Sequence, residues 1–288
     1  MKNFLLFILF TTTLSAQIKG KVVDEKNNPI AYVNIWVESE NIGTTANEQG
    51  EFTINTTIDK KLIFTAVGFE TLTSKISENG VITLKTYIEE LEEVVIGNPK
   101  GTEEIELGEL KDNNSTTSTV FPFIYAQKIE NNDTIAKHKF LKNLTFLATT
   151  SKDSVKMIVH FYKPNKDGFP GSDLLDENLI VYLKKGKEKK NKIDLTSHNI
   201  KFPKKGLFIG FEWMIIEENR YFFEGKNKNL NDKVKLYDPS LHHNKLHRFK
   251  EFHYTKGKWL KYEDIKRIST SNRIPESKDL CLKLTLTN

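Results

Sequence analysis

The stretch GKVVDEKNNPIAYVNIWV, residues 20–37, decides the architecture of the first third of the chain. A polar turn ends at Pro29, whose ring fixes φ and removes a backbone donor. The following residues alternate between apolar and other side chains, with a period of two that is typical of a strand with one buried face. The apolar positions are Ala31, Val33, Ile35 and Val37.

The same pattern continues on both sides of this stretch. Between residues 18 and 96, short apolar alternations are separated by turns about every ten residues, and no helical period appears. Gly43, Gly50 and Gly68 mark three of these turns. The pattern predicts a β-sandwich.

Ordered pieces of this region resemble the carboxypeptidase-regulatory-like domain family. They are GKVVD and PIAYVNI (residues 20–24 and 29–35), GTTANEQGEF (43–52) and VGF (67–69). The resemblance covers about residues 17–97 and implies a seven-stranded transthyretin/Ig-like sandwich. It implies no catalysis, because the family takes its name from the companion domain of some peptidases.

The first residues are typical of a secretory signal. Lys2 precedes an apolar run at residues 4–10, and small residues follow before Gln17. The run is shorter than the roughly 20 residues that span a bilayer. We therefore expect residues 1–16 to be a cleaved signal peptide. The protein would then be periplasmic or extracellular, associated with the outer membrane or cell envelope at most peripherally.

The second half is also predicted to be all-β. Residues 98–118 are polar and are expected to form a flexible linker. Strand patterns resume in residues 119–288, including an apolar run at residues 207–216 that is expected to be a central strand. PGSDLL (170–175) and GLFIGFEW (206–213) resemble the jelly-roll sandwiches that follow the first domain in some exported bacterial proteins. The sequence thus predicts a jelly-roll-like β-sandwich over residues 119–288, tethered to the first domain.

Charge is unevenly distributed along the chain. Residues 119–288 carry 33 Lys/Arg and 20 Asp/Glu, a net charge of +13, whereas the chain as a whole carries +5. Export argues against nucleic acid, so the basic half is expected to meet an anionic envelope surface, a glycan or an envelope protein. A merely solubilising surface is the alternative. The lysines singled out lie in a predicted hairpin loop: Lys184, Lys185, Lys187, Lys189 and Lys190.

Catalytic motifs are absent from the sequence. None of the seven histidines begins a His-Glu-x-x-His or His-x-x-Glu motif, and there is no Gly-x-Ser-x-Gly elbow. One cysteine excludes an intrachain disulfide. We therefore expect a non-catalytic binding or assembly protein without a cofactor. The alternative is a glycan hydrolase that uses paired carboxylates, Glu212 with Glu217 or Glu218.

Aromatic residues and one polar turn supply the remaining candidates. Amphipathic rings tolerate a wet groove and can stack on sugars, and the surface candidates are Tyr221, Tyr254, Trp259 and Tyr262. Asn165 and Asp167 open a segment similar to a calcium loop, although a plain β-turn before Pro170 is the alternative. Residues 89–97, EELEEVVIG, resemble the TonB-box segment that follows this domain in outer-membrane transporters, or else form the last strand of the first sandwich.

Overall fold

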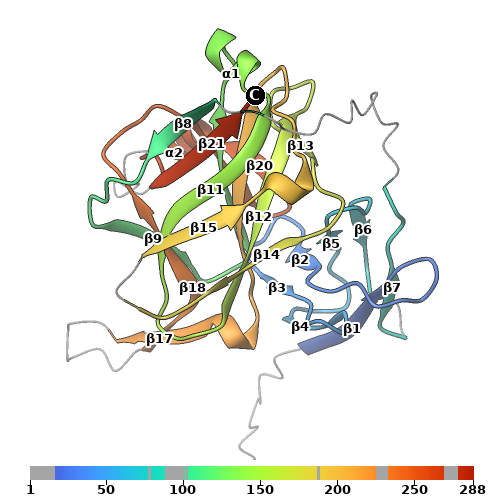
Figure 1. The fold of residues 1–288 in the computed structure, drawn as a ribbon. Coiled ribbons are helices and arrows are strands. Elements are labelled where there is room, and N and C mark those ends of the chain that lie inside the picture. The colour runs from blue at the N-terminus through green and yellow to red at the C-terminus, as the bar shows by residue number, and fades with distance from the viewer. Residues whose placement is uncertain are drawn as a thin grey trace, which may run out of the picture.

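The computed structural model describes residues 17–76, 79–87, 101, 103–186, 189–224, 233–268 and 278–288. The first part of the chain forms a small sandwich of two sheets, with strand orders β4-β1-β7 and β3-β2-β5-β6 (Figure 1). Its strands are β1 (Gln17–Val23), β2 (Asn34–Val37), β3 (Gly43–Thr45), β4 (Glu51–Asn55), β5 (Leu62–Thr65), β6 (Leu72–Ser74) and β7 (Val81–Thr83). These seven strands confirm the predicted sandwich.

The alternation seen in the sequence fills the core of the small sandwich. Val33, Ile35 and Val37 point inward, and the rings of Phe52 and Phe64 pack in a T-shaped arrangement with their centroids 5.9 Å apart. Gly50 ends the turn before β4 with a φ of +71°, a conformation that a residue with a Cβ rarely adopts. The sequence therefore specifies this unit through its apolar period and its turns.

The rest of the chain forms a larger sandwich of two seven-stranded sheets. One sheet has the order β13-β12-β16-β10-β19-β20, with β14 also paired to β12. The other has the order β17-β18-β11-β21-β8, with β15 also on β11 and β9 also on β18. The elements are β8 (Glu104–Glu109), β9 (Ser115–Thr119), β10 (Phe123–Ile129), α1 (Asp133–Lys137), β11 (Phe140–Thr149), β12 (Val155–Pro164), β13 (Pro170–Asp173), β14 (Leu179–Leu183), β15 (Lys190–Asp194), η1 (Thr196–His198), β16 (Leu207–Trp213), η2 (Glu217–Asn219), β17 (Arg220–Glu224), β18 (Lys233–His243), β19 (Lys250–Thr255), β20 (Lys258–Lys261), α2 (Tyr262–Ile268) and β21 (Leu282–Thr287).

The two sheets of the large sandwich enclose one extended core. Alternate residues of β12 and β16 meet those of β11 and β21, and Phe146 packs against Phe211 at a ring distance of 5.0 Å. The buried Trp213 donates its indole N–H to the carbonyl of Pro239 at 2.6 Å. β16 pairs with β12 and β10 on its two sides, as expected of the central strand predicted from its apolar run. Within the described residues, no helix is long and apolar enough to cross a membrane.

The expected linker belongs in large part to the large sandwich, which is a correction to the sequence prediction. β8 pairs with β21, and β9 pairs with β18, so both strands are held by sheet hydrogen bonds. Ile105 and Leu107 pack against the core. Two apolar residues on one face are enough to anchor an edge strand to the core. The low overall apolar content of residues 98–118 made this strand hard to recognise in the sequence. Residues 89–97, the TonB-box-like segment, lie outside the described residues.

The two sandwiches share a buried seam, so they are packed together and not merely tethered (Figure 1). Trp36 and Ile63 of the small sandwich pack against Ile124 and Tyr254 of the large one. On the other side of the seam Tyr32 packs in a cluster with Ile158, Met214 and Ile216. Both clusters cover the outer face of the sheet that contains β16.

Polar contacts reinforce the seam. The hydroxyl of Thr45 accepts the backbone N–H of Ile215 at 2.9 Å in a buried position. The ammonium of Lys156 lies 2.9 Å from both Glu48 and the Tyr32 hydroxyl. These contacts join residues more than 100 positions apart in the chain, which sequence periodicity cannot reveal.

Candidate ligand-binding groove

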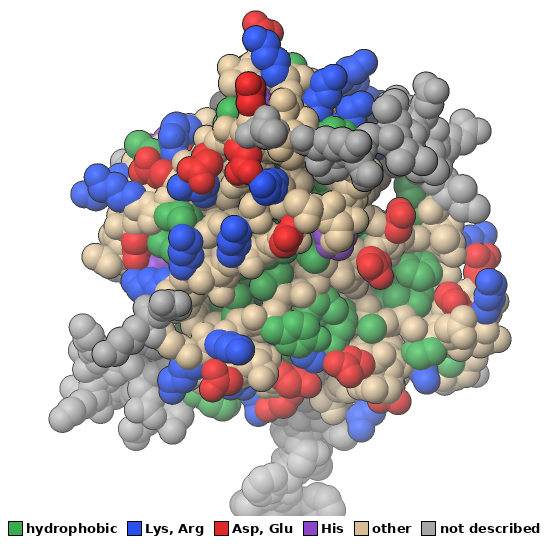
Figure 2. Space-filling view, in the orientation of Figure 1, with side chains coloured by type: hydrophobic (Ala, Val, Ile, Leu, Met, Phe, Trp, Pro, Cys, Tyr) green, Lys and Arg blue, Asp and Glu red, His purple; other side chains and the backbone are tan. Residues whose placement is uncertain are grey.

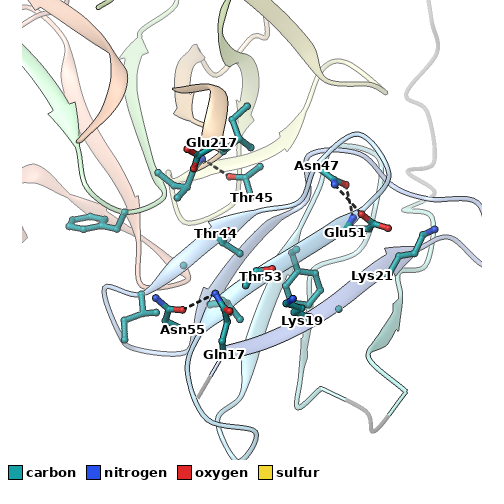
Figure 3. A pocket seen from close by; sticks show the side chains of 18 of the residues that line it. Gln17, Lys19, Lys21, Thr44, Thr45, Asn47, Glu51, Thr53, Asn55 and Glu217 are labelled. Atoms are coloured by element: carbon teal, nitrogen blue, oxygen red, sulfur yellow. Dashed lines mark hydrogen bonds between the residues drawn. The ribbon is translucent and has the colours of Figure 1, made fainter. Parts of the chain in front are cut away.

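A groove of about 1180 Å³ runs along the junction of the two sandwiches (Figure 3). Its floor is the outward face of the sheet β4-β1-β7. Because side chains alternate along a strand, every second residue of β1 and β4 points into the groove. Neighbouring side chains pair across the floor as Gln17 with Asn55, Lys19 with Thr53, and Lys21 with Glu51.

The walls of the groove come from both sandwiches. The small sandwich contributes residues 41–45, and the large one contributes residues 120–121, residues 215–218 and two residues of β18. The hydrogen bond from Ile215 to Thr45 fixes the two walls to each other (Figure 3). Exposed apolar side chains, Ile42 and Val120, lie on the two sides.

The lining of the groove is polar and balanced in charge. Lys19, Lys21 and Lys235 face the same space as Glu51, Glu217 and Glu218. Glu217 also forms an ion pair with Arg220, and Asn47 donates to Glu51 at 3.2 Å. The remaining lining is rich in amides and hydroxyls, which both donate and accept hydrogen bonds.

The predicted aromatic candidates do not lie in this groove. Tyr254 is only 8% exposed, because the small sandwich covers it in the seam. Trp259 is half-buried, with its ring 5.3 Å from that of Tyr254 and 5.6 Å from that of Tyr162. Tyr221 and Tyr262 are half-exposed on β17 and α2, and Tyr262 meets the ring of His253 at 6.1 Å. Tyr254 and Trp259 therefore pack the seam, and the four rings do not form one surface.

The predicted lysine cluster is not a hairpin loop. β14 and β15, which flank it, belong to different sheets, so the segment crosses between the two layers. Lys184, Lys185 and Lys190 are exposed, whereas Lys189 forms an ion pair with Asp112 at 2.8 Å. Lys187 lies outside the described residues. Figure 2 shows lysines interspersed with acids over the face of the large sandwich that it draws.

The calcium-loop candidate is organised as a turn. The side-chain oxygen of Asn165 accepts the backbone N–H groups of Asp167 at 2.9 Å and Phe169 at 3.0 Å. That oxygen is already occupied by its own backbone, as in an Asx turn. Among the described residues, no three or more His, Cys, Asp or Glu side chains are placed so that they could hold a metal ion.

The predicted carboxylate pair is separated by burial. Glu212 lies on the outer face of β16 beneath the small sandwich, whereas Glu217 and Glu218 line the open groove. Glu212 instead bonds His160 Nε2 at 2.9 Å, and Asp173 bonds His160 Nδ1 at 2.8 Å. Burial of His160 favours the neutral ring, but the two carboxylates outweigh it and raise the pKa to about 9.

Sequence reasoning missed this buried trio and the groove floor. His160 and Asp173 stand at ordinary polar positions, and a period-two pattern cannot tell a solvent-facing residue from one covered by another domain. Gln17, Lys19, Thr53 and Asn55 likewise occupy the polar half of simple alternations. The alternation does indicate that these four side chains face outward, and it is the one feature of the sequence that points to the groove floor.

Comparison with known proteins identifies the first unit. Residues 18–96 match the family model of the CarboxypepD_reg-like domain, which confirms the resemblance drawn from the sequence. No curated protein matches the chain.

Among the solved structures that match, one aligns with most of the chain at 9% identity and a TM-score of 0.38. It is the crystal structure of the cysteine protease and lectin-like domains of Cwp84, a surface layer associated protein of Clostridium difficile. The alignment covers 95% of this chain and 58% of that one. At this TM-score the likeness carries no argument about fold or function.

Proposed function

We propose that the protein is a non-catalytic binding protein that holds a segment of neutral polysaccharide in the groove between its sandwiches. The observation that carries the proposal is the ladder of amide, hydroxyl and charged side chains along β1 and β4. Sugar hydroxyls both donate and accept, and amides such as Asn55 do the same. The apolar side chains of Ile42 and Val120 offer contact to the C–H faces of the rings.

The size and charge of the groove narrow the ligand class. Its volume of about 1180 Å³ exceeds the 300–1,000 Å³ typical of small-molecule pockets, which suits several linked sugar rings. Three lysines and three glutamates line it, so the local field does not favour a polyanion. The proposal therefore departs from the anionic surface suggested by the basic second half of the sequence.

A hydrolytic role has less support in the geometry. Glu212 hydrogen-bonds His160 under the small sandwich, and Glu217 forms an ion pair with Arg220. We keep export and a peripheral envelope location as part of the proposal, in line with the signal-like residues 1–16.

Affinity electrophoresis of the full chain tests the proposal, with a soluble β-glucan, a mannan and a xylan as neutral probes and alginate as the anionic comparison. At least one neutral probe should retard the protein, and the variant Lys19→Ala/Asn55→Ala should lose at least about tenfold in affinity, or about 1.4 kcal/mol. Thr83→Ala, an exposed residue of β7 outside the groove, is the control. Binding of alginate alone, or equal binding by all variants, would contradict the proposal, and release of reducing ends would contradict its non-catalytic part.

A further inference from the structure

β14 forms an open edge of the seven-stranded sheet that contains β16. It pairs with β12 along its whole length, from Leu179 opposite Val159 to Leu183 opposite Val155. Within the described parts of the chain, no strand pairs with its other side. Such an edge presents free backbone donors and acceptors to a further strand.

The side chains of β14 are apolar on both faces. Leu179, Val181 and Leu183 pack on the core of the large sandwich, and Ile180 packs beside Ile158 at the seam. Tyr182 is 61% exposed. Figure 2 shows an apolar patch where Figure 1 places β14. An open apolar edge invites association, and natural proteins usually blunt such edges with charges or cover them.

The charges that flank β14 have opposite signs. Asp176 and Glu177 precede the strand, and Lys184 and Lys185 follow it, so the segment runs in the order acidic, apolar, basic. All four residues are exposed, and none forms an ion pair with another described residue. A strand with this order complements itself when a second copy runs antiparallel to it.

We propose that two copies of this chain associate through β14, in an antiparallel pairing about a twofold axis at Val181. Side chains opposite each other must lie on the same face of the sheet, and pairing centred on Val181 meets this condition. It places Ile180 opposite the partner's Tyr182, and Leu179 opposite the partner's Leu183. At each end Glu177 meets the partner's Lys185.

A second copy fits this edge better than an unrelated strand because the pattern is its own complement. Each ion pair and each apolar pair away from the axis occurs twice by symmetry, so the interface is isologous and closes at two chains. The pairing joins the two sheets into one, so the open edge of β14 is covered in both copies. This inference is independent of the glycan proposal, since β14 does not line the groove.

Charge reversal in the full chain tests the pairing. Sedimentation velocity at low salt, up to about 200 µM protein, should show a concentration-dependent dimer of the unmodified chain. Glu177→Lys and Lys185→Glu each place like charges opposite each other twice, so each should weaken the dimer at least about tenfold. Lys190→Glu, an exposed charge reversal on β15, should leave the dimer unchanged.

Mixing the two weakened variants gives the decisive measurement. In the mixed dimer the introduced lysine of one variant faces the introduced glutamate of the other, and the second pair is native, so the mixture should regain the original affinity. A monomer at every concentration would overturn the proposal. So would failure of the mixture to recover, or an effect of Lys190→Glu equal to that of Lys185→Glu, with circular dichroism verifying that each variant is folded.

Discussion

The two faces of β16 are equally buried but differ in what buries them. Leu207, Ile209, Phe211 and Trp213 face the core of their own sandwich, while Phe208, Gly210 and Glu212 face outward. The outward face is covered by aromatic neighbours and, around Glu212, by the small sandwich. A strand at the junction of two domains therefore serves two cores, and the second core accommodates charges that the first excludes.

The largest change in stability is expected for Trp36→Ala, at the centre of the seam. Trp36 is fully buried between the sandwiches, so its loss should lower the free energy of unfolding by about 3–5 kcal/mol, as Phe211→Ala should on the inner face. Differential scanning calorimetry should show one transition that shifts as a whole. Phe222→Ala, at an exposed position, is the control. Two transitions, with only one displaced, would mean that the sandwiches fold independently.

The next test concerns the charges of the outward face. His160 has a folded-state pKa of about 9, above the ordinary value near 6.5. Because the pKa is raised, protonated His160 stabilises the folded state fully below about pH 6.5. This contribution to the free energy of unfolding, up to roughly 3 kcal/mol, is lost as the pH rises through 9. The stacked Tyr162 does not titrate in this window, because burial raises its pKa well above 10.

Urea unfolding of the unmodified chain and of His160→Gln, at pH 6, 8 and 10, measures this effect. The unmodified chain should lose stability across the series, and the variant should lose much less. Parallel pH dependence in the two proteins would show that His160 is not charged beside Asp173 and Glu212.

The smallest effect is expected at the rim of the seam. Thr45→Val removes the acceptor of the buried N–H of Ile215, which should cost about 1–3 kcal/mol. Thr44→Val, on the neighbouring residue that lines the groove, is the matched control and should change stability by less than about 0.5 kcal/mol. Equal chemical denaturation midpoints for the two variants would contradict a role for Thr45 in joining the sandwiches.

The features that depend on the local alternation of apolar residues could be predicted from the sequence. The small sandwich follows from alternations such as Val33, Ile35 and Val37, and β16 was recognisable as a central strand. The burial of the residues that face outward near β16 could not be predicted. Trp36, Ile158 and Tyr254 alternate as half-exposed strand residues do, and they are buried only because one sandwich docks on the other. The groove depends on that same docking, so its walls could not be predicted from either sandwich alone.

β21 has a consequence for how the large sandwich assembles. It lies between β11 and β8, and Lys283 forms an ion pair with Glu106, 177 residues earlier in the chain. Until β21 is synthesised, the edges of β8 and β11 that pair with it have no partner strand. The last step of folding therefore depends on contacts between residues far apart in the sequence. A chain that still lacks β21 folds slowly and exposes these strand edges to aggregation.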